Sequence, residues 1–245
     1  MTDLVFWHGW AMAPHVFTPL MDALHRQNAA LTCQTVALPG YTDTQKPNIS
    51  TMTDWVDALM AEIGRPSVLV AWSMGAMLAL DAAVRYPDKI QKLVLFGATP
   101  RFVNGNGWAY GLSPDTASRF KEGVKADRMK TLKRFTVLFN QKDIQAREIT
   151  RFLGDIPCPA ANGVLLQGLD FLHTADFRDV VPKIRQETLL IHGAHDPLMP
   201  VEAAKWLSQM IPHANLEIVP DAAHAPFLSN PAVCVQAIGR FLSWI

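Results

Sequence analysis

The chain has 245 residues, of which 49% are hydrophobic and 18% charged, a balance typical of a globular protein with a sizeable core. Its 22 basic and 22 acidic side chains cancel, so the whole molecule offers no electrostatic reason to bind nucleic acid or a membrane surface. Three widely spaced cysteines without a CxxC pair exclude a disulfide framework and a zinc knuckle. With no signal-peptide pattern and no apolar run long enough to span a bilayer, we expect a cytoplasmic monomer.

Short apolar segments alternate with helical patterns at both ends of the chain. The predicted strands are 4–7, 31–38, 67–72, 90–96, 188–192 and 215–219. The predicted helices between them are 14–27, 50–63, 74–85, 201–210 and 231–241. Continuously apolar strands that alternate with helices are typical of a parallel sheet covered on both faces. We therefore predict an α/β fold with a mainly parallel sheet of about six strands.

The alternation stops between residues 101 and 185. This stretch has helical patterns at 115–123, 125–140, 145–153, 161–169 and around 171–180, and no convincing strand. A helical insertion between two strands of such a sheet predicts a cap over an active site. We therefore assign residues 1–100 and 186–245 to the core and residues 101–185 to a helical cap.

The motif Ala71-Trp72-Ser73-Met74-Gly75 lies between a predicted strand and a predicted helix. It is G-x-S-x-G with Ala in place of the first Gly. Small flanking residues are needed because the nucleophilic serine sits on a sharp, strained turn from strand to helix. The alternative is a serine that caps a helix in an ordinary turn. The strand and helix on either side favour Ser73 as a nucleophile.

A serine nucleophile needs a base, and the base needs an acid to orient it. Asp196 and His224 each follow a late predicted strand, in the order Ser, Asp, His that is usual for this kind of site. His195 is a rival base, but it directly precedes the acid, so the two side chains should diverge. Asp221 is a rival acid, but it lies only three residues before His224 and reads as a loop-capping residue.

His192, His195 and Asp196 together also allow a metal site. No other cluster of ligands supports it, and His192 falls at the end of a buried strand. We therefore expect neither a metal nor an organic cofactor.

An oxyanion hole needs two backbone N–H groups directed at the developing negative charge. One should come from Met74, which follows the nucleophile. The other should come from Trp10 in the loop His8-Gly9-Trp10 after the first strand. The alternative reading of this loop is a strand-ending turn with an anchoring tryptophan.

The segments HGWAMAPHVF, LPGYTD, AWSMGAM, HGAHDPLMP and AAHAPFLSNPA resemble the α/β-hydrolase superfamily along nearly the whole chain. The combination of HGW, x-W-S-x-G and A-A-H-A-P-F most resembles the pimeloyl-[acyl-carrier-protein] methyl ester esterases of biotin synthesis. The resemblance implies an α/β-hydrolase fold, the triad Ser73, Asp196 and His224, and the oxyanion donors Trp10 and Met74. It also implies that Arg134, Arg147 and Arg151 hold a carrier protein.

The chain departs from the family pattern in three places. The family usually has Gly at position 71, and a second Gly and a Ser in the loop that is LPGYTDTQ in this chain. Most members also have an N-terminal hairpin, whereas this chain starts almost directly at the HGW strand. The sheet should therefore be wholly parallel.

The cap carries most of the positive charge. Between Arg119 and Arg151, ten basic and four acidic side chains leave a net charge of +6 in a neutral protein. A basic cap suits an acidic partner or an anionic substrate. The alternative is a solvated, solubilising surface.

Together these features predict a serine carboxylic-ester hydrolase that cleaves the methyl ester of a pimeloyl chain on acyl carrier protein, with Trp72 and Phe139 beside the acyl chain. A broad-specificity carboxylesterase for small free esters is the first alternative. A ligand receptor on a hydrolase scaffold is the second, and the intact triad disfavours it. Dehalogenase and epoxide hydrolase chemistry would need a carboxylate at position 73.

Overall fold

The structure, a computed structural model, describes residues 3–42 and 50–244. Within this part of the chain, six strands form one parallel sheet in the order β2-β1-β3-β4-β5-β6. The strands are β1 (Asp3–Trp7), β2 (Thr32–Val36), β3 (Ser67–Trp72), β4 (Ile90–Phe96), β5 (Glu187–Gly193) and β6 (Ala214–Val219). The predicted α/β fold with a wholly parallel sheet is confirmed.

Burial explains the order of the strands. The continuously apolar strand β3 is buried along its whole length, and it lies between β1 and β4 in the middle of the sheet. The two edge strands, β2 and β6, keep several exposed or half-buried residues. Strands that are covered on both faces read as unbroken apolar runs, which is why the central strands were the easiest to predict.

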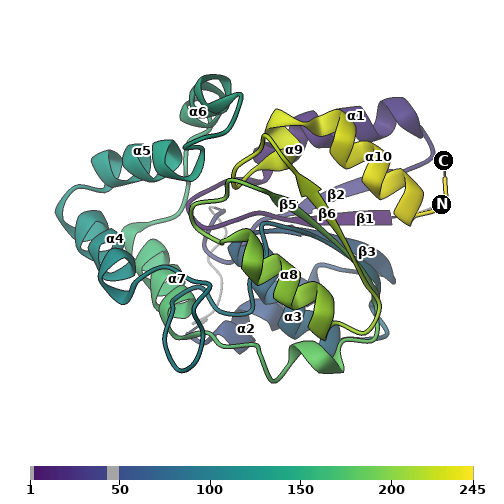
Figure 1. Cartoon of the computed structure of the whole chain (residues 1–245), viewed down its shortest axis with the longest axis horizontal. Coiled ribbons are helices and arrows are strands. Elements are labelled where there is room, and N and C mark those ends of the chain that lie inside the picture. Colours follow the sequence, from purple (N-terminus) through teal and green to yellow (C-terminus); the bar gives the residue numbers. More distant parts are fainter. Residues whose placement is uncertain (1–2, 43–49, 245) are drawn as a thin grey trace.

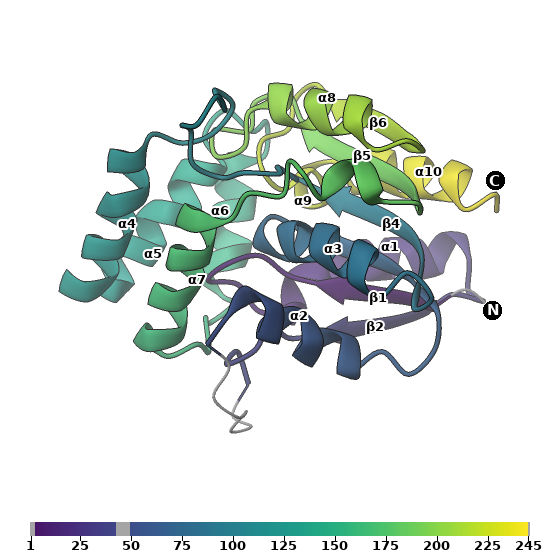
Figure 2. The ribbon, with the colours of Figure 1, turned by 90° about the horizontal axis from the view of Figure 1, so that it is seen from below.

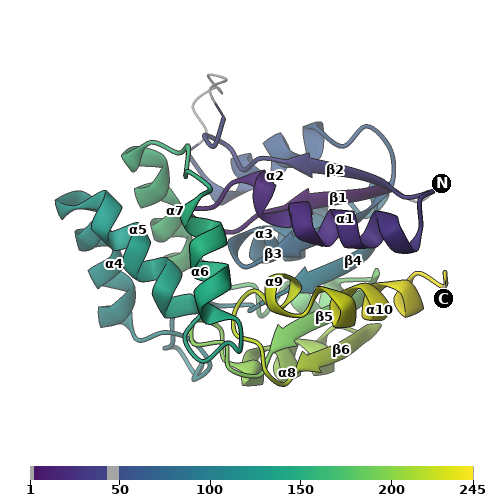
Figure 3. The ribbon, with the colours of Figure 1, turned by 90° about the horizontal axis from the view of Figure 1, so that it is seen from above.

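Helices cover both faces of the sheet (Figures 2 and 3). One face carries α1 (Thr18–Gln27), the short α9 (Pro226–Ser229) and α10 (Pro231–Phe241). The other face carries α2 (Met52–Ala61), α3 (Met74–Arg85) and α8 (Val201–Met210).

The helix predicted at 14–27 is divided in the structure. It begins as the 3₁₀ helix η1 (Pro14–Phe17) and continues as α1. Pro19 lies at the start of α1, and proline has no N–H with which to join an α-helical hydrogen bond to the preceding turn. By contrast, α2 is a single helix that begins at Met52, two residues after the predicted start, because Thr51 and Asp54 form a reciprocal capping box there.

A helical insertion follows β4 and lies beyond the carboxyl ends of the strands (Figure 1). It contains α4 (Pro114–Ala126), α5 (Arg128–Phe139), α6 (Ala146–Gly154) and α7 (Asn162–Thr174), and the 3₁₀ helix η2 (Val181–Lys183) follows before β5. The two helices predicted at 161–169 and 171–180 are wrong. They are the single helix α7, because no proline or capping residue interrupts the chain between Leu169 and Phe171.

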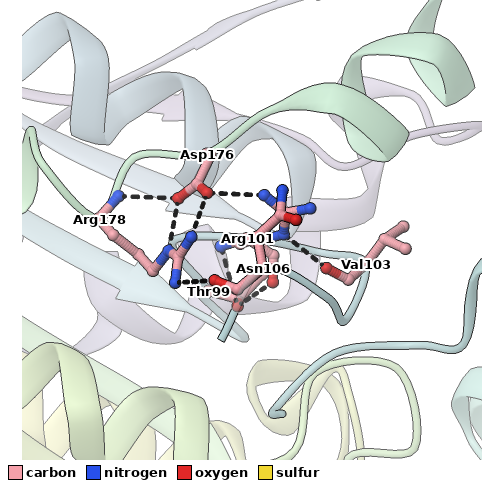
Figure 4. Close-up of polar contacts among 6 residues, drawn as sticks. All are labelled: Thr99, Arg101, Val103, Asn106, Asp176 and Arg178. Carbon is pink, nitrogen blue, oxygen red and sulfur yellow. Dashed lines mark hydrogen bonds and ion pairs between the residues drawn. The ribbon is translucent and has the colours of Figure 1, made fainter. Parts of the chain in front are cut away.

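The two segments that connect this cap to the sheet lie side by side and are joined by the ion pair of Arg101 with Asp176 (Figure 4). Asp176 accepts hydrogen bonds from Arg101 at 2.6 Å and from Arg178 at 2.7 and 2.8 Å. The backbone N–H of Phe177 also donates to the carbonyl of Pro100 at 2.8 Å. Hydrogen bonds from Arg178, and then from Arg101, outweigh partial burial and lower the pKa of Asp176 to about 2.

Two further points concern the limits of the described residues. The loop LPGYTDTQ, in which the sequence departs from the family pattern, is described only as far as Thr42, and its last three residues lie outside the described part. Among the helices of the described residues, none is long and apolar enough to cross a membrane.

Candidate active site

Ser73 occupies the turn between β3 and α3 in a strained conformation. Its φ of 58° and ψ of −120° are rare for any residue except glycine. The Ser73 N–H donates to the carbonyl of Phe96 at 3.0 Å, which ties the turn to the neighbouring strand. A Cβ atom at Gly75 would come within 2.6 Å of the carbonyl oxygens of Trp7 and His8, so only glycine fits there. The motif is therefore a strand-to-helix turn that presents Ser73 at the carboxyl edge of the sheet.

The structure brings Asp196 and His224 together. The Nδ1 of His224 donates to Oδ2 of Asp196 at 2.6 Å, and both side chains are buried. The other carboxylate oxygen of Asp196 accepts from the backbone N–H groups of Leu198 and Met199, each at 2.9 Å. The acid is thus fixed at both oxygens, and it fixes the tautomer of His224 with the proton on Nδ1.

Burial and charge act in opposite directions on the Asp196 carboxyl group. Burial favours its protonated form, but the electrostatic attraction and hydrogen bond of His224, together with the Met199 N–H, outweigh burial and lower the pKa of Asp196. His192 itself donates from Nε2 to the carbonyl of Met199 at 2.7 Å, and burial lowers its pKa. Asp196 is therefore ionised at neutral pH beside a neutral His192.

His224 lies next to the turn that carries Ser73. The indole N–H of Trp72, the residue before Ser73, donates to the carbonyl of His224 at 2.8 Å. Gly97, the residue after the acceptor of the Ser73 N–H, lies against the imidazole ring. The Nε2 atom of His224 is buried and has no hydrogen-bond partner among the described residues. It is the atom that a general base would direct at the serine hydroxyl.

The rival residues lie elsewhere. His195 and Asp221 are both exposed, whereas His224 and Asp196 are buried. The exposed His195 does not converge with His192, whose Nε2 already donates to a carbonyl. Within residues 3–42 and 50–244, no group of three or more His, Cys, Asp or Glu side chains is arranged to hold a metal ion.

The loop after β1 lies directly against Ser73. A Cβ atom at Gly9 would come within 3.1 Å of the Ser73 Cβ and 3.5 Å of its Oγ.

His8 and Tyr41 hold this loop in place. The Nε2 atom of His8 accepts from the Leu38 N–H at 3.1 Å. The Nδ1 atom of His8 therefore carries the proton and donates to Gly9 O at 2.8 Å. Burial lowers the pKa of His8 to about 4, so the ring is neutral. The Tyr41 hydroxyl accepts from the Ala11 N–H at 3.0 Å and holds Ala11 at its φ of 61°.

Of the two expected oxyanion donors, Met74 directly follows Ser73 in sequence, and Trp10 follows Gly9, which lies against Ser73. Met74 is the first residue of α3, so its N–H has no acceptor within the helix, and neither it nor the Trp10 N–H has one elsewhere in the described chain. The cap helix α7 covers both residues. A Cβ atom at Gly168 would come within 2.8 Å of the Trp10 ring and 3.4 Å of the Met74 sulfur. The indole N–H of Trp10 donates to the carbonyl of Leu165 at 2.9 Å.

The remaining predicted site residues divide into two groups. The rings of Trp72 and Phe139 pack against His224, with centroids 5.4 and 5.7 Å from its ring. Arg134, Arg147 and Arg151 are exposed on α5 and α6, and none has an ion-pair partner in the part of the chain that the structure describes. The structure therefore does not bring the arginines to the triad.

A cavity of about 470 Å³ lies between the cap and the loop after Trp10. Its lining is mostly apolar and comes from the loop after β1, from α5 and from the end of α6 with the segment that follows. The lining includes Ala11, Met12, Leu132, Phe135, Thr136 and Leu153, with Arg128 and Lys133 at its charged side. An apolar chain bound there would lie beside the loop after β1.

Several residues that support the site were not predicted from the sequence. Gly97 and Tyr41 carry no motif that marks them, because their contacts join segments far apart in the chain. The sequence gives only a weak sign of the role of His8. A histidine that follows a buried strand either is exposed at the edge of the sheet or needs buried hydrogen-bond partners, and His8 has such partners.

Comparisons with known proteins place this geometry in a family. A family model described as the alpha/beta hydrolase fold matches residues 4–231. The chain is 38% identical over 247 residues to the pimeloyl-[acyl-carrier protein] methyl ester esterase of Aromatoleum aromaticum, with 96% of each chain covered. It is 34% identical to the protein of the same name from Nitrosomonas europaea, with 94% of this chain and 91% of that protein covered.

Solved structures agree on the fold. An esterase from Exiguobacterium antarcticum superposes with a TM-score of 0.89 at 24% identity, covering 99% of this chain and 92% of that one. A bromoperoxidase from Bacillus anthracis gives a TM-score of 0.90 at 23% identity, with the same coverage. At such identities the likeness concerns the fold alone. With the family match over nearly its whole length and a relative at 38% identity, the chain belongs to the α/β-hydrolase family.

Proposed function

We propose that the protein is a serine esterase that cleaves the methyl ester of a pimeloyl chain carried on acyl carrier protein. The observation that carries the esterase part is the buried His224–Asp196 pair. Nε2 of His224 has no hydrogen-bond partner among the described residues, and Trp72 ties the backbone of His224 to the strained Ser73 turn. The relatives named as pimeloyl-[acyl-carrier protein] methyl ester esterases support the substrate. We also propose that the protein is a cytoplasmic monomer and that its cap spans residues 101–185.

The proposed reaction begins with the transfer of the Ser73 hydroxyl proton to Nε2 of His224, while the serine oxygen attacks the ester carbonyl. The backbone N–H groups of Trp10 and Met74 stabilise the negative oxygen of the tetrahedral intermediate. Asp196 stabilises the imidazolium, and that proton then leaves with methanol. Water activated by His224 hydrolyses the acyl-enzyme to release the carboxylic acid.

The charge of the cap supports a carrier-bound substrate. Arg147 and Arg151 are four residues apart on α6 and therefore share one face of the helix. With Arg134 on α5 they offer guanidinium groups that no carboxylate in the described chain neutralises. Free, exposed guanidinium groups suit the acidic surface of a carrier protein and its phosphate, and they speed the encounter of oppositely charged partners.

The cavity beside Ala11 and Met12 supports the same substrate class. Its apolar lining suits a hydrocarbon chain, and Arg128 and Lys133 supply positive charge on its wall. In the proposed complex this cavity takes the acyl chain of the carrier-bound ester. Trp72 and Phe139 close the site on the side of His224.

The test compares two substrates, pimeloyl methyl ester on acyl carrier protein and p-nitrophenyl acetate. In the wild type we expect kcat/KM for the carrier-linked ester to exceed that for the free ester. Changing Arg134, Arg147 and Arg151 together to Ala should lower the carrier-linked kcat/KM by roughly 10-fold to 100-fold and leave the free ester unaffected. The loss should shrink as salt is added.

A matched control removes the same charge elsewhere. Arg26, Lys205 and Arg240 are exposed on the α/β core, so their triple change to Ala alters the net charge equally but leaves the cap intact. Equal losses in both triple variants would show a general charge effect and contradict carrier docking on the cap. Hydrolysis of the free ester alone by the wild type would favour a broad-specificity carboxylesterase. Full activity of Ser73→Ala on both substrates would refute the esterase itself.

A further inference from the structure

The cap does more than cover His224, because it also holds the loop that carries this residue. Three hydrogen bonds join the base loop, Asp221–His224, to the end of α5 and the segment after it. The His224 N–H donates to Phe139 O at 3.2 Å, and the Ile144 N–H donates to Asp221 O at 3.0 Å. The Ala223 N–H donates to Oδ2 of Asp143 at 2.8 Å.

Asp143 is the side chain at the centre of this contact. It is buried, with 7% of its surface exposed, although it lies in the connection between two surface helices. Its Oδ1 accepts from the Gln145 N–H at 2.9 Å, so each of its carboxylate oxygens accepts from a backbone N–H. It has no ion-pair partner among the described residues. Burying a carboxylate is costly unless its oxygens are hydrogen-bonded, so its presence here needs a reason.

We propose that Asp143 is a positioning residue for the base His224, an inference that rests on the proposed esterase function. Asp196 holds the ring of His224 at Nδ1, whereas Asp143 and Phe139 hold two consecutive backbone N–H groups, of Ala223 and His224. The base is therefore held at both its side chain and its backbone. A displacement of 1 Å at a reacting group can lower the rate roughly 100-fold, so the second anchor bears directly on turnover.

The two N–H donors explain why the residue is an aspartate. An ionised carboxylate offers acceptors on both oxygens, whereas an asparagine amide offers one oxygen and one NH₂ group. In Asp143→Asn, the NH₂ group would face either Gln145 N–H or Ala223 N–H and leave that donor without an acceptor. The isosteric variant should therefore disturb the base loop, even though it keeps the shape of the side chain.

The experiment measures three properties of Asp143→Asn and Asp143→Ala. With p-nitrophenyl acetate, kcat should fall by roughly 10-fold to 100-fold while KM changes by less than about 3-fold. The rate at which a fluorophosphonate labels Ser73 should fall by the same factor, because that reaction also needs the base. The downfield proton NMR signal of the His224 Nδ1–H should shift or broaden, which a change confined to stability would not cause.

Asp127→Asn is the matched control. Asp127 caps the start of α5 through the Lys130 N–H at 3.0 Å, is also in the cap, and lies in no hydrogen bond to the base loop. It should keep kcat, the labelling rate and the NMR signal of the wild type. Each variant is assayed about 15 °C or more below its own melting temperature. If Asp143→Asn does not fold, the test uses Asp143→Ala, which adds no NH₂ group.

The outcomes separate this inference from the proposed function. Wild-type kcat and NMR signal in folded Asp143 variants would overturn the positioning role while leaving the esterase intact. Equal losses in Asp127→Asn would also overturn it, since they would show a general loosening of the cap. Ser73→Ala is assayed in parallel: activity in that variant would refute the proposed function, whatever Asp143 does.

Discussion

The imidazole ring of His224 lies against the α-carbon of Gly97. A methyl group at Gly97 would come within 3.0 Å of the ring atoms Cε1 and Nδ1. Gly97 also has a φ of 49°, a conformation that side chains rarely adopt. The His224 ring therefore packs on the bare backbone that follows β4, next to the Phe96 carbonyl that accepts from the Ser73 N–H.

Gly97→Ala should lower kcat by roughly 10-fold to 100-fold, because the new methyl group pushes the His224 ring away from its place. It should also lower the free energy of unfolding by about 1 kcal/mol from the strained φ. Steady-state kinetics and urea denaturation measure the two effects. Gly163→Ala in α7 is the control, since a methyl group there meets nothing within 4 Å, and it should keep full activity. Equal activities in the two variants would contradict the contact.

Asp196→Asn should lower kcat by roughly 10⁴-fold with little change in KM. An amide has only one oxygen, so it cannot accept from the Leu198 and Met199 N–H groups on one side and from the Nδ1–H of His224 on the other. The tautomer and orientation of the ring are therefore lost. Asp221→Asn, in the exposed rival acid, should stay within about 2-fold of the wild type, as surface changes usually do. If the Asp221 variant loses more activity than the Asp196 variant, the assignment of the acid is wrong.

The Asp176 ion pairs should make the stability depend on pH in the acid range. Because the folded state lowers the pKa of Asp176 from 3.8 to about 2, the pairs stabilise the fold fully above about pH 5, and this contribution disappears as the pH falls toward 2. At pH 7, Asp176→Asn should therefore lower the free energy of unfolding by roughly 1 to 2 kcal/mol. The difference from the wild type should shrink between pH 5 and pH 3. A difference that is constant over this range would contradict an electrostatic origin.

Filling the cavity should affect one substrate and spare the other. Thr136 lines it from α5, so Thr136→Trp should raise KM for the carrier-linked ester by roughly 10-fold or more, since a bulky ring takes the room of the bound chain. Hydrolysis of p-nitrophenyl acetate should stay within about 3-fold. Gln236→Trp, at a hollow between α1 and α10 on the core, is the control and should change neither reaction. Unchanged kinetics in Thr136→Trp would place the substrate chain elsewhere.

The parts of the molecule that sequence predicted well are those with a local signal. β3, β4, α3 and α8 have the predicted boundaries, because an apolar run or helical pattern in each ends at a turn residue or a polar segment. The structure pairs His224 with Asp196, as the order of the residues in the sequence suggested. Pro19 divided one predicted helix, and the absence of any breaker near Asp170 joined two others.

The contacts that no local pattern reveals are those between distant segments. Asp143 looks like an ordinary loop residue in sequence, and only its approach to Ala223, 80 residues later, shows its place in the site. The same holds for Tyr41, which reaches the Ala11 N–H across 30 residues. Such contacts depend on the assembled fold, so a single sequence carries no sign of them.

The paired segments that connect the cap to the sheet at Asp176 show where this scaffold could be redesigned. Because the two connections of the cap leave the sheet side by side, at Arg101 and Asp176, a different helical cap could be spliced in at these two points without breaking any strand. A chimera built this way would nevertheless lack the partners of Ala223 and His224. Transplanting residues 139–145 into the foreign cap should restore turnover, which would make this short segment the minimum that a new cap must inherit.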